Sequence, residues 1–127
     1  MNTAVIGLGS NIAPQKNIKV AKTILSHEFT ILAESKFVKT KPVGPIKQAD
    51  FLNGALLVKT PLNRRQLKSK LARIEKKLGR KASANKFGPR TIDLDILVMN
   101  GRVVDNDFYA RDFVQKSVLT LLPELRS

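Results

Sequence analysis

The spacing of apolar side chains divides the first half of the chain into alternating extended and helical segments. Thr3 to Gly9 is a short run of β-branched and apolar residues that ends at a Gly-Ser-Asn turn, which predicts a strand. Apolar residues at helical spacing predict a helix from Asn17 to Phe29. Thr30 to Thr40 returns to extended character, and Leu52 to Thr60 predicts a further strand.

The second half of the chain contains the clearest helical signal. Apolar side chains recur at i, i+4, i+7 and i+11 from Leu67 to Leu78, and Gly79 is a natural helix end. Arg80 to Pro89 is polar and contains small residues, so we expect a mobile loop there. Ile92 to Met99 predicts a final strong strand.

Two prolines separate the two halves. Each proline lacks a backbone donor and restricts the residue before it, so Lys41 to Pro45 is expected to be a shaped loop. The elements on either side follow the order β-α-β, loop, β-α-β. This order predicts an α+β fold, a ferredoxin-like βαββαβ sandwich with an antiparallel sheet and helices on one face. With no repeat or linker visible, we expect one domain over residues 1–127.

Composition excludes several kinds of protein. The chain has 43% hydrophobic and 26% charged residues, as globular domains do, and it has no cysteine. Disulfides, thiolate metal sites and a cysteine nucleophile are therefore excluded. No apolar run approaches the roughly 18 residues that span a bilayer. The first residues lack the basic region of a signal peptide, so we expect a soluble, cytoplasmic protein.

The net charge indicates an anionic partner. Twenty-three basic residues against ten acidic ones leave +13 at pH 7. From Asn63 to Arg90 there are eleven Lys or Arg residues and one acid, Glu75. A solvated basic helix would account for this stretch, but a surface that attracts polyphosphate is the favoured interpretation because two carboxylates follow directly.

Those carboxylates are Asp93 and Asp95. Side chains alternate along a strand, so both project from one face while the apolar residues between them project from the other. Their Cα atoms are expected roughly 6.5 Å apart. Two carboxylates this close repel one another unless a cation intervenes, and Mg²⁺ is typically held by one or two carboxylates plus substrate phosphates. The alternative is a solvated sheet face on which the pair meets Arg90.

Phe51 and Asn53 form a second candidate group. At i and i+2 of an extended segment, an aromatic face and an amide edge point the same way and could hold a flat heterocycle. The alternative is an ordinary core aromatic followed by a polar residue at a strand entrance. Gly7 to Asn11 places glycines after a strand but lacks the lysine of a phosphate-binding P-loop. The single histidine, His27, excludes a histidine-rich zinc site.

Taken together, these segments resemble the hydroxymethyl-dihydropterin pyrophosphokinases of folate biosynthesis. The match covers about residues 4 to 99 in the order of the family, and its last segment is highly specific. The matching segments are Gly7 to Asn11, Thr40 to Pro45, Phe51 to Asn53, Ile74-Glu75 with Leu78 to Arg80, and Phe87 to Leu97. Arg111 to Phe113 is similar to the family's Arg-x-Phe motif.

The resemblance implies Mg²⁺-dependent transfer of pyrophosphate from ATP to 6-hydroxymethyl-7,8-dihydropterin, with release of AMP. Asp93 and Asp95 would bind two Mg²⁺ ions and, with Arg90, form the catalytic group. The residues implied in binding the nucleotide are Glu75, Arg80, Lys86, Arg90 and Arg111. The residues implied in binding the pterin are Thr40, Pro42, Val43, Phe51, Asn53 and Phe113.

The chain departs from the family after the paired aspartates. Members usually carry a Pro-His loop before the Arg-x-Phe motif, whereas here Asn100 to Ala110 contains neither residue. A catalytically reduced paralogue that binds pterin or nucleotide is therefore the second hypothesis. A basic nucleic-acid-binding domain is the third, disfavoured because no RNA-recognition aromatic pattern is present. Neither a membrane partner nor any oligomeric state is indicated by the sequence.

Overall fold

The structure, a computed structural model, describes residues 1–42, 44–79, 89, 91–105 and 107–125. Its strands are β1 (Asn2–Ser10), β2 (Thr30–Glu34), β3 (Val38–Thr40), β4 (Phe51–Thr60), β5 (Asp93–Met99) and β6 (Arg102–Val103). Its helices are α1 (Pro14–Glu28), α2 (Arg64–Lys77), α3 (Asp107–Ala110) and α4 (Asp112–Leu121). In the described part of the chain, no helix combines the length and the apolar character needed to cross a membrane. The loop predicted from Arg80 to Pro89 lies almost entirely outside the described residues.

One antiparallel sheet organises these elements. Its strand order is β2-β4-β1-β5-β6, and β3 also pairs with β4. The four long strands therefore follow the ferredoxin-like order, in which the first and third strands lie side by side at the centre. The expected α+β class and antiparallel sheet are confirmed, with β3 and β6 as additions.

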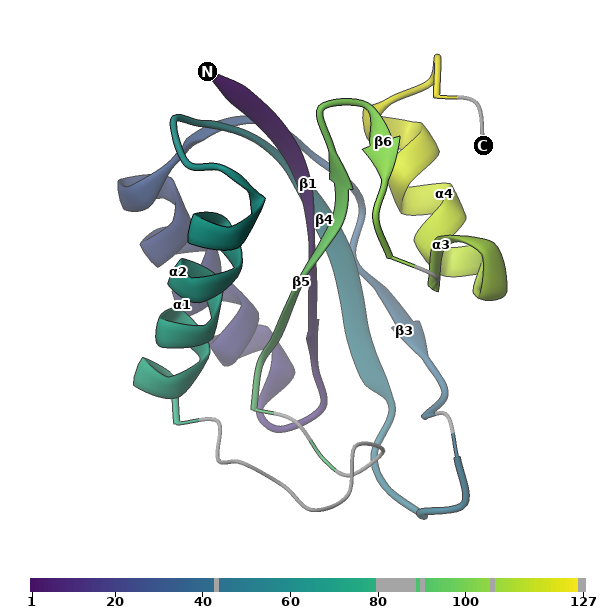
Figure 1. Ribbon diagram of the computed structural model, residues 1–127. Helices are drawn as coiled ribbons and strands as arrows, with labels where there is room; N and C mark the ends of the chain where they lie inside the picture. The colour runs from purple at the N-terminus through teal and green to yellow at the C-terminus, as the bar shows by residue number, and fades with distance from the viewer. Residues whose placement is uncertain (43, 80–88, 90, 106, 126–127) are drawn as a thin grey trace.

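The first face of the sheet is covered by α1 and α2, which lie side by side in Figure 1. The stripe predicted for α2 points into the core, where Leu67, Leu71 and Ile74 are buried. A capping box begins this helix: the Asn63 side chain accepts a hydrogen bond from the Gln66 backbone, and the Gln66 side chain accepts one from Asn63. The entry of α2 is therefore defined by the sequence itself.

The second face is covered in part by α4, on the opposite side of the sheet in Figure 1. Val114, Val118 and Leu121 form a helical stripe that packs in a separate apolar cluster with Val5 and Val98 of the sheet. The prediction that helices cover one face of the sheet is correct for α1 and α2, but α4 covers part of the other face. The stripe spans only two turns, and its i, i+4, i+7 spacing is the sequence pattern from which this helix could have been predicted.

A β-bulge interrupts β5 at Leu97. On β1, Ile6 pairs with Ile96 but Val5 pairs with Val98, which leaves Leu97 as the extra residue. The bulge changes which residues of β5 face α4. Before the bulge, the odd-numbered residues Asp93 and Asp95 lie on the side of α4. After the bulge, the even-numbered Val98 lies on that side. One strand can therefore present carboxylates at one end and apolar side chains at the other, both toward α4.

Val118 tests whether α4 depends on this second apolar cluster. The side chain is 0% exposed, so Val118→Ala removes two buried methyl groups and should lower the free energy of unfolding by about 2 kcal/mol. Leu119→Ala, at a side chain 39% exposed on the same helix, should change it by less than about 0.5 kcal/mol. Urea denaturation measures both values. Equal losses in the two variants would contradict the packing described for α4.

Candidate functional site

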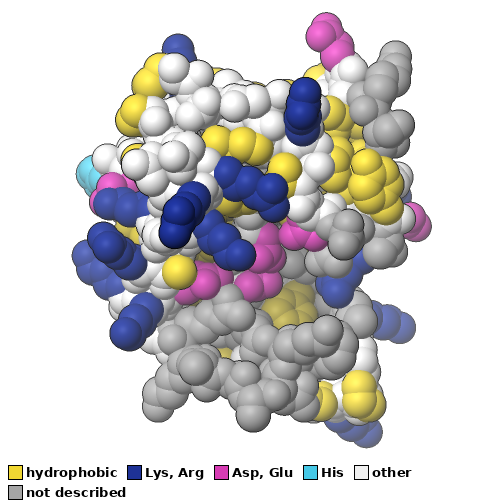
Figure 2. All heavy atoms as spheres, in the orientation of Figure 1, with side chains coloured by type: hydrophobic (Ala, Val, Ile, Leu, Met, Phe, Trp, Pro, Cys, Tyr) yellow, Lys and Arg dark blue, Asp and Glu magenta, His cyan; other side chains and the backbone are white. Residues whose placement is uncertain are grey.

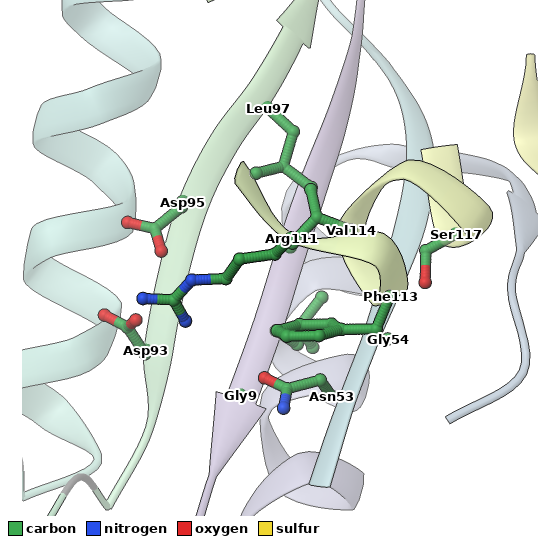
Figure 3. Close-up of a pocket in the computed structure, with 12 residues that line it drawn as sticks. Gly9, Asn53, Gly54, Asp93, Asp95, Leu97, Arg111, Phe113, Val114 and Ser117 are labelled. Atoms are coloured by element: carbon green, nitrogen blue, oxygen red, sulfur yellow. The ribbon is translucent and has the colours of Figure 1, made fainter. Parts of the chain in front are cut away.

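Asp93 and Asp95 lie on β5 directly opposite two glycines of β1. Asp93 pairs with Gly9 and Asp95 pairs with Gly7. Residues opposite one another in an antiparallel pair project from the same face of the sheet. The predicted common direction of the two carboxylates is visible in Figure 3, and the neighbouring positions on β1 carry no side chain at all.

The main chain at these glycines forms the floor of a trough. Gly9 is paired on its other side with Asn53 of β4, and a Cβ atom on Gly9 would lie 2.6 Å from Asn53 Oδ1. A Cβ atom on Gly7 would lie 3.0 Å from the Leu97 side chain. The two glycines therefore serve the close approach of side chains from neighbouring strands. Sequence reasoning treated them as a weak phosphate-loop signal and missed this role, although their i, i+2 spacing in a strand places both on one face.

Phe113 and Arg111 cover the trough from the start of α4. Figure 3 shows the Phe113 ring lying over the strands near Gly9 and Asn53, while the Arg111 guanidinium points toward the space between Asp93 and Asp95. The space that they cover has a volume of about 60 Å³. Arg111, Phe113 and Ser117 also line a groove of about 810 Å³ between β3 and α4, so the trough and this groove are neighbours.

A second cavity of about 330 Å³ lies between α2 and β5. Its apolar wall consists of Leu71, Leu94, Ile96 and Val104; its acids are Glu75, Asp93, Asp95 and Asp105, and its cations are Arg64 and Lys68. Figure 2 shows acidic side chains gathered near the middle of this face, with Lys and Arg side chains alongside over α2. Both signs of charge therefore meet in one hollow.

Asp93 and Asp95 line both cavities. A ligand in the trough and a ligand in the α2 cavity would approach the same two carboxylates from different sides. This geometry suits transfer of a group between two bound molecules, with a cation at the carboxylates.

Glu75 fixes the distance between α2 and the acid pair. Its Oε2 atom accepts a hydrogen bond of 2.7 Å from the backbone N–H of Leu94, the residue between the two aspartates. The helix that provides the cations of the α2 cavity is thereby tied to the strand that provides its acids. Glu75 was predicted in the nucleotide site; the structure places it in the wall of this cavity.

The ionised form of Asp95 is disfavoured in the folded protein. Desolvation by surrounding protein atoms is the main cause that raises the pKa of Asp95 from 3.8 to about 8, even though the residue as a whole is exposed. The Asp93 carboxylate raises this pKa further by repulsion and by a hydrogen bond to the protonated form, and Asp105 and Glu75 add smaller contributions. A cation held at the pair would remove this penalty.

The donor set fits Mg²⁺ bound together with a phosphate. Among the described residues, no three His, Cys, Asp or Glu side chains converge as a complete metal-binding group. Mg²⁺ usually takes only one or two carboxylates from the protein and completes its octahedron with water and substrate phosphates. Two oxygen-donating carboxylates that repel one another are therefore a suitable partial site.

The predicted pterin residues are only partly brought together. The Asn53 side-chain amide donates a hydrogen bond to the Thr40 hydroxyl, and Asn53 shares the trough with Phe113. Thr40 shares the neighbouring groove with Phe113. Phe51 lines a cavity of about 280 Å³ beside Pro14, and its predicted role opposite Phe113 stays a prediction.

Several predicted residues lie elsewhere or outside the described part of the chain. Pro42 is half-buried in the segment after β3. Val43, Arg80, Lys86 and Arg90 are outside the described residues, so their predicted roles stay predictions. Asp105, in contrast, is an unpredicted member of the α2 cavity. It lies after β6, and no pattern in the sequence connects it to the acid pair.

Comparison with known proteins identifies a family. The family model described as 7,8-dihydro-6-hydroxymethylpterin-pyrophosphokinase (HPPK) matches residues 5–123. A Haemophilus influenzae 2-amino-4-hydroxy-6-hydroxymethyldihydropteridine pyrophosphokinase is 34% identical over 125 residues, covering 90% of this chain and 78% of the relative. The Bacillus subtilis protein of the same name is 38% identical over 109 residues, covering 84% and 65%. An Arabidopsis thaliana folate synthesis bifunctional protein is 32% identical, covering 93% and 26%.

The raised pKa of Asp95 predicts that the stability of the Mg²⁺-free protein depends on pH in an unusual way. Because the folded pKa lies above the unfolded value, the folded state holds the extra proton between pH 3.8 and about 8, and stability should fall as the pH rises through this range. Asp95→Asn should remove this decline, which thermal melts at several pH values would reveal. Added Mg²⁺ should raise the melting temperature of the unmodified protein most at high pH. A carboxyl of Asp95 that titrates near 4 in metal-free NMR experiments would contradict the assignment.

Proposed function

The chain belongs to the 7,8-dihydro-6-hydroxymethylpterin-pyrophosphokinase family, and we propose that its pyrophosphate transfer takes place between the two cavities that meet at Asp93 and Asp95. Membership makes the protein a transferase of folate biosynthesis that acts on a hydroxymethyl-dihydropterin. The observation that supports the location is the shared lining: the same carboxylates border a trough on the α4 face and a cavity beside α2.

The trough and its adjoining groove are the proposed acceptor side. The trough alone is below the roughly 300–1,000 Å³ of common ligand sites, but it shares Arg111, Phe113 and Ser117 with the larger groove. Asn53 offers an amide edge to the pterin, and Phe113 offers a ring face. Thr40 orients the Asn53 amide through their hydrogen bond. Pro42, Val43 and Phe51 complete the proposed acceptor contacts, as the family resemblance implies.

The cavity beside α2 is the proposed donor side, and ATP is the proposed donor. Its size and apolar wall suit a nucleotide, and its acids lie next to the place where phosphate must react. Glu75 holds this wall in position through Leu94. Arg80, Lys86, Arg90 and Arg111 are the proposed phosphate contacts.

The proposed reaction forms one O–P bond and breaks one O–P bond and one O–H bond. The hydroxymethyl oxygen of the pterin attacks the β-phosphorus of ATP, and the bond from that phosphorus to the α–β bridging oxygen breaks, so that AMP leaves and the hydroxyl proton is released to solvent. Mg²⁺, two ions in our proposal, would neutralise phosphate charge when bound to Asp93 and Asp95. The chain itself contributes position: β5 holds the two carboxylates in register, and the trough and α2 cavity orient acceptor and donor toward them. Membership of a folate-pathway family supports a proposed cytoplasmic location.

Asp95→Asn tests the proposal directly. The unmodified protein, incubated with Mg²⁺, ATP and 6-hydroxymethyl-7,8-dihydropterin, should release AMP and form the pterin diphosphate. Asp95→Asn should lower kcat at least about a hundredfold, because a neutral amide cannot replace a charged Mg²⁺ ligand. Its affinity for the pterin should change by less than about threefold. Glu124→Gln removes one negative charge from an exposed position and is the control.

Three outcomes discriminate. Release of AMP that depends on Asp95 supports the proposal. Normal turnover in Asp95→Asn would refute the metal assignment. Binding of both substrates without any release of AMP would favour the non-catalytic paralogue instead.

Gly9→Ala tests the acceptor trough. The new Cβ atom would lie 2.6 Å from Asn53 Oδ1, so the amide must move and its hydrogen bond to the pterin should be lost. KM for the pterin should rise about threefold to tenfold, the effect of about 0.5–1.5 kcal/mol for one hydrogen bond. KM for ATP should not change. In an Asn53→Ala background the same substitution should have little further effect, and full additivity in this double-mutant cycle would contradict the mechanism.

A further inference from the structure

The cations of α2 differ in what they face. The helix carries seven Lys or Arg residues, and only Arg64 and Lys68 line the cavity that contains the acid pair. The two residues are four positions apart and therefore lie on one side of the helix. Lys70 instead forms an ion pair of 2.8 Å with Glu28 of α1. The basic stretch noted in the sequence thus contributes two described cations of α2 to this cavity.

Arg64 and Lys68 lie at the end of the cavity remote from the acid pair. Glu75, hydrogen-bonded beside the two aspartates, marks the end of the cavity that contains the acids. With a rise of 1.5 Å per residue, Lys68 lies about 10 Å and Arg64 about 16 Å from Glu75 along the helix axis. The apolar side chains of Leu71 and Ile96 line the cavity as well. The cavity therefore has an acidic end, an apolar wall and a basic end.

Helix stability does not account for a cation at Arg64. Arg64 is in the first turn of α2, which contains no acidic residue. A positive charge there opposes the helix dipole and is unfavourable for the helix. Arg65 has the same cost but does not share the cavity lining, so it provides a matched comparison on the same turn.

From this arrangement, and resting on the proposed function, we infer that Arg64 and Lys68 bind the part of the donor that leaves as AMP. The pyrophosphoryl group that is transferred must lie at the acid pair, because the acceptor trough opens there. The remaining part of the donor must then extend along the cavity toward its basic end. Lys68, the nearer of the two to the acid pair along α2, would then meet the α-phosphate, and Arg64 would lie further along, toward the nucleoside. The two cations would hold AMP in place while the transferred group reacts.

Binding of AMP itself tests this inference, since AMP lacks the transferred group. Calorimetry with AMP and Mg²⁺ should give a Kd at least about tenfold higher for the Arg64→Ala/Lys68→Ala variant than for the unmodified protein. The matched control is Arg65→Ala/Arg73→Ala, which also removes two exposed positive charges from α2. Its Kd should rise less than about twofold, because neither residue lines the cavity. Lys68→Arg, which preserves the charge, should retain most of the affinity.

The contrary outcomes are equally specific. Equal weakening in the two double variants would show a general effect of net charge and overturn the inference, as would failure of the unmodified protein to bind AMP. Binding of Mg²⁺-pyrophosphate should be the same in both double variants, and a selective loss in Arg64→Ala/Lys68→Ala would mean that the pair contacts the transferred group instead. Thermal melts verify that each variant is folded.

Failure of this inference can be told apart from failure of the proposed function. The protein could release AMP from ATP while its affinity for AMP does not depend on Arg64 and Lys68. This result would support the proposed function and reject the inference. Loss of AMP binding on removing these two residues, in a protein that transfers no pyrophosphate, would retain the binding site and reject the proposed reaction.

Discussion

Repulsion between the carboxylates of Asp93 and Asp95 is the constraint around which the molecule is organised. Backbone pairing with β1 holds both residues on one face of β5, so the two charges cannot separate by a change in the strand. β6 pairs with the far end of β5, at Val98 and Met99, and among the described strands no other pairs with β5 on that side. The raised pKa of Asp95 reflects desolvation first and this repulsion second. A divalent cation bound at the pair would relieve the repulsion, as the proposed function requires.

The surrounding elements supply what the acid pair lacks. α4 brings an arginine and an aromatic ring to one side of the pair, and α2 brings an apolar wall and two cations to the other. The two helices lie on opposite faces of the sheet, and each is anchored by its own apolar cluster. Glu75 adds a direct link from α2 to the backbone between the aspartates. The contacts that pack α2 and α4 on the sheet therefore also position the residues around the acid pair.

Local patterns predicted much of this arrangement. The strand and helix order, the stripe of α2 and the common direction of Asp93 and Asp95 all follow from spacing within single segments. What escaped prediction depends on contacts between segments. The bulge at Leu97 arises from pairing with β1, and Asp105 reaches the α2 cavity only through the connection after β6.

The glycine floor of the trough has a consequence for how the site can evolve. Gly7 and Gly9 already present the least bulk that a residue can have, so any substitution there can only make the space shallower. The strands beneath cannot recede either, because they are the centre of the sheet. Accommodation of a bulkier acceptor must therefore come from the roof, by smaller side chains in place of Phe113 or Arg111 or by displacement of α4. In this architecture the glycine floor sets a fixed depth, and the volume available to an acceptor can increase only through changes in Phe113, Arg111 or the position of α4.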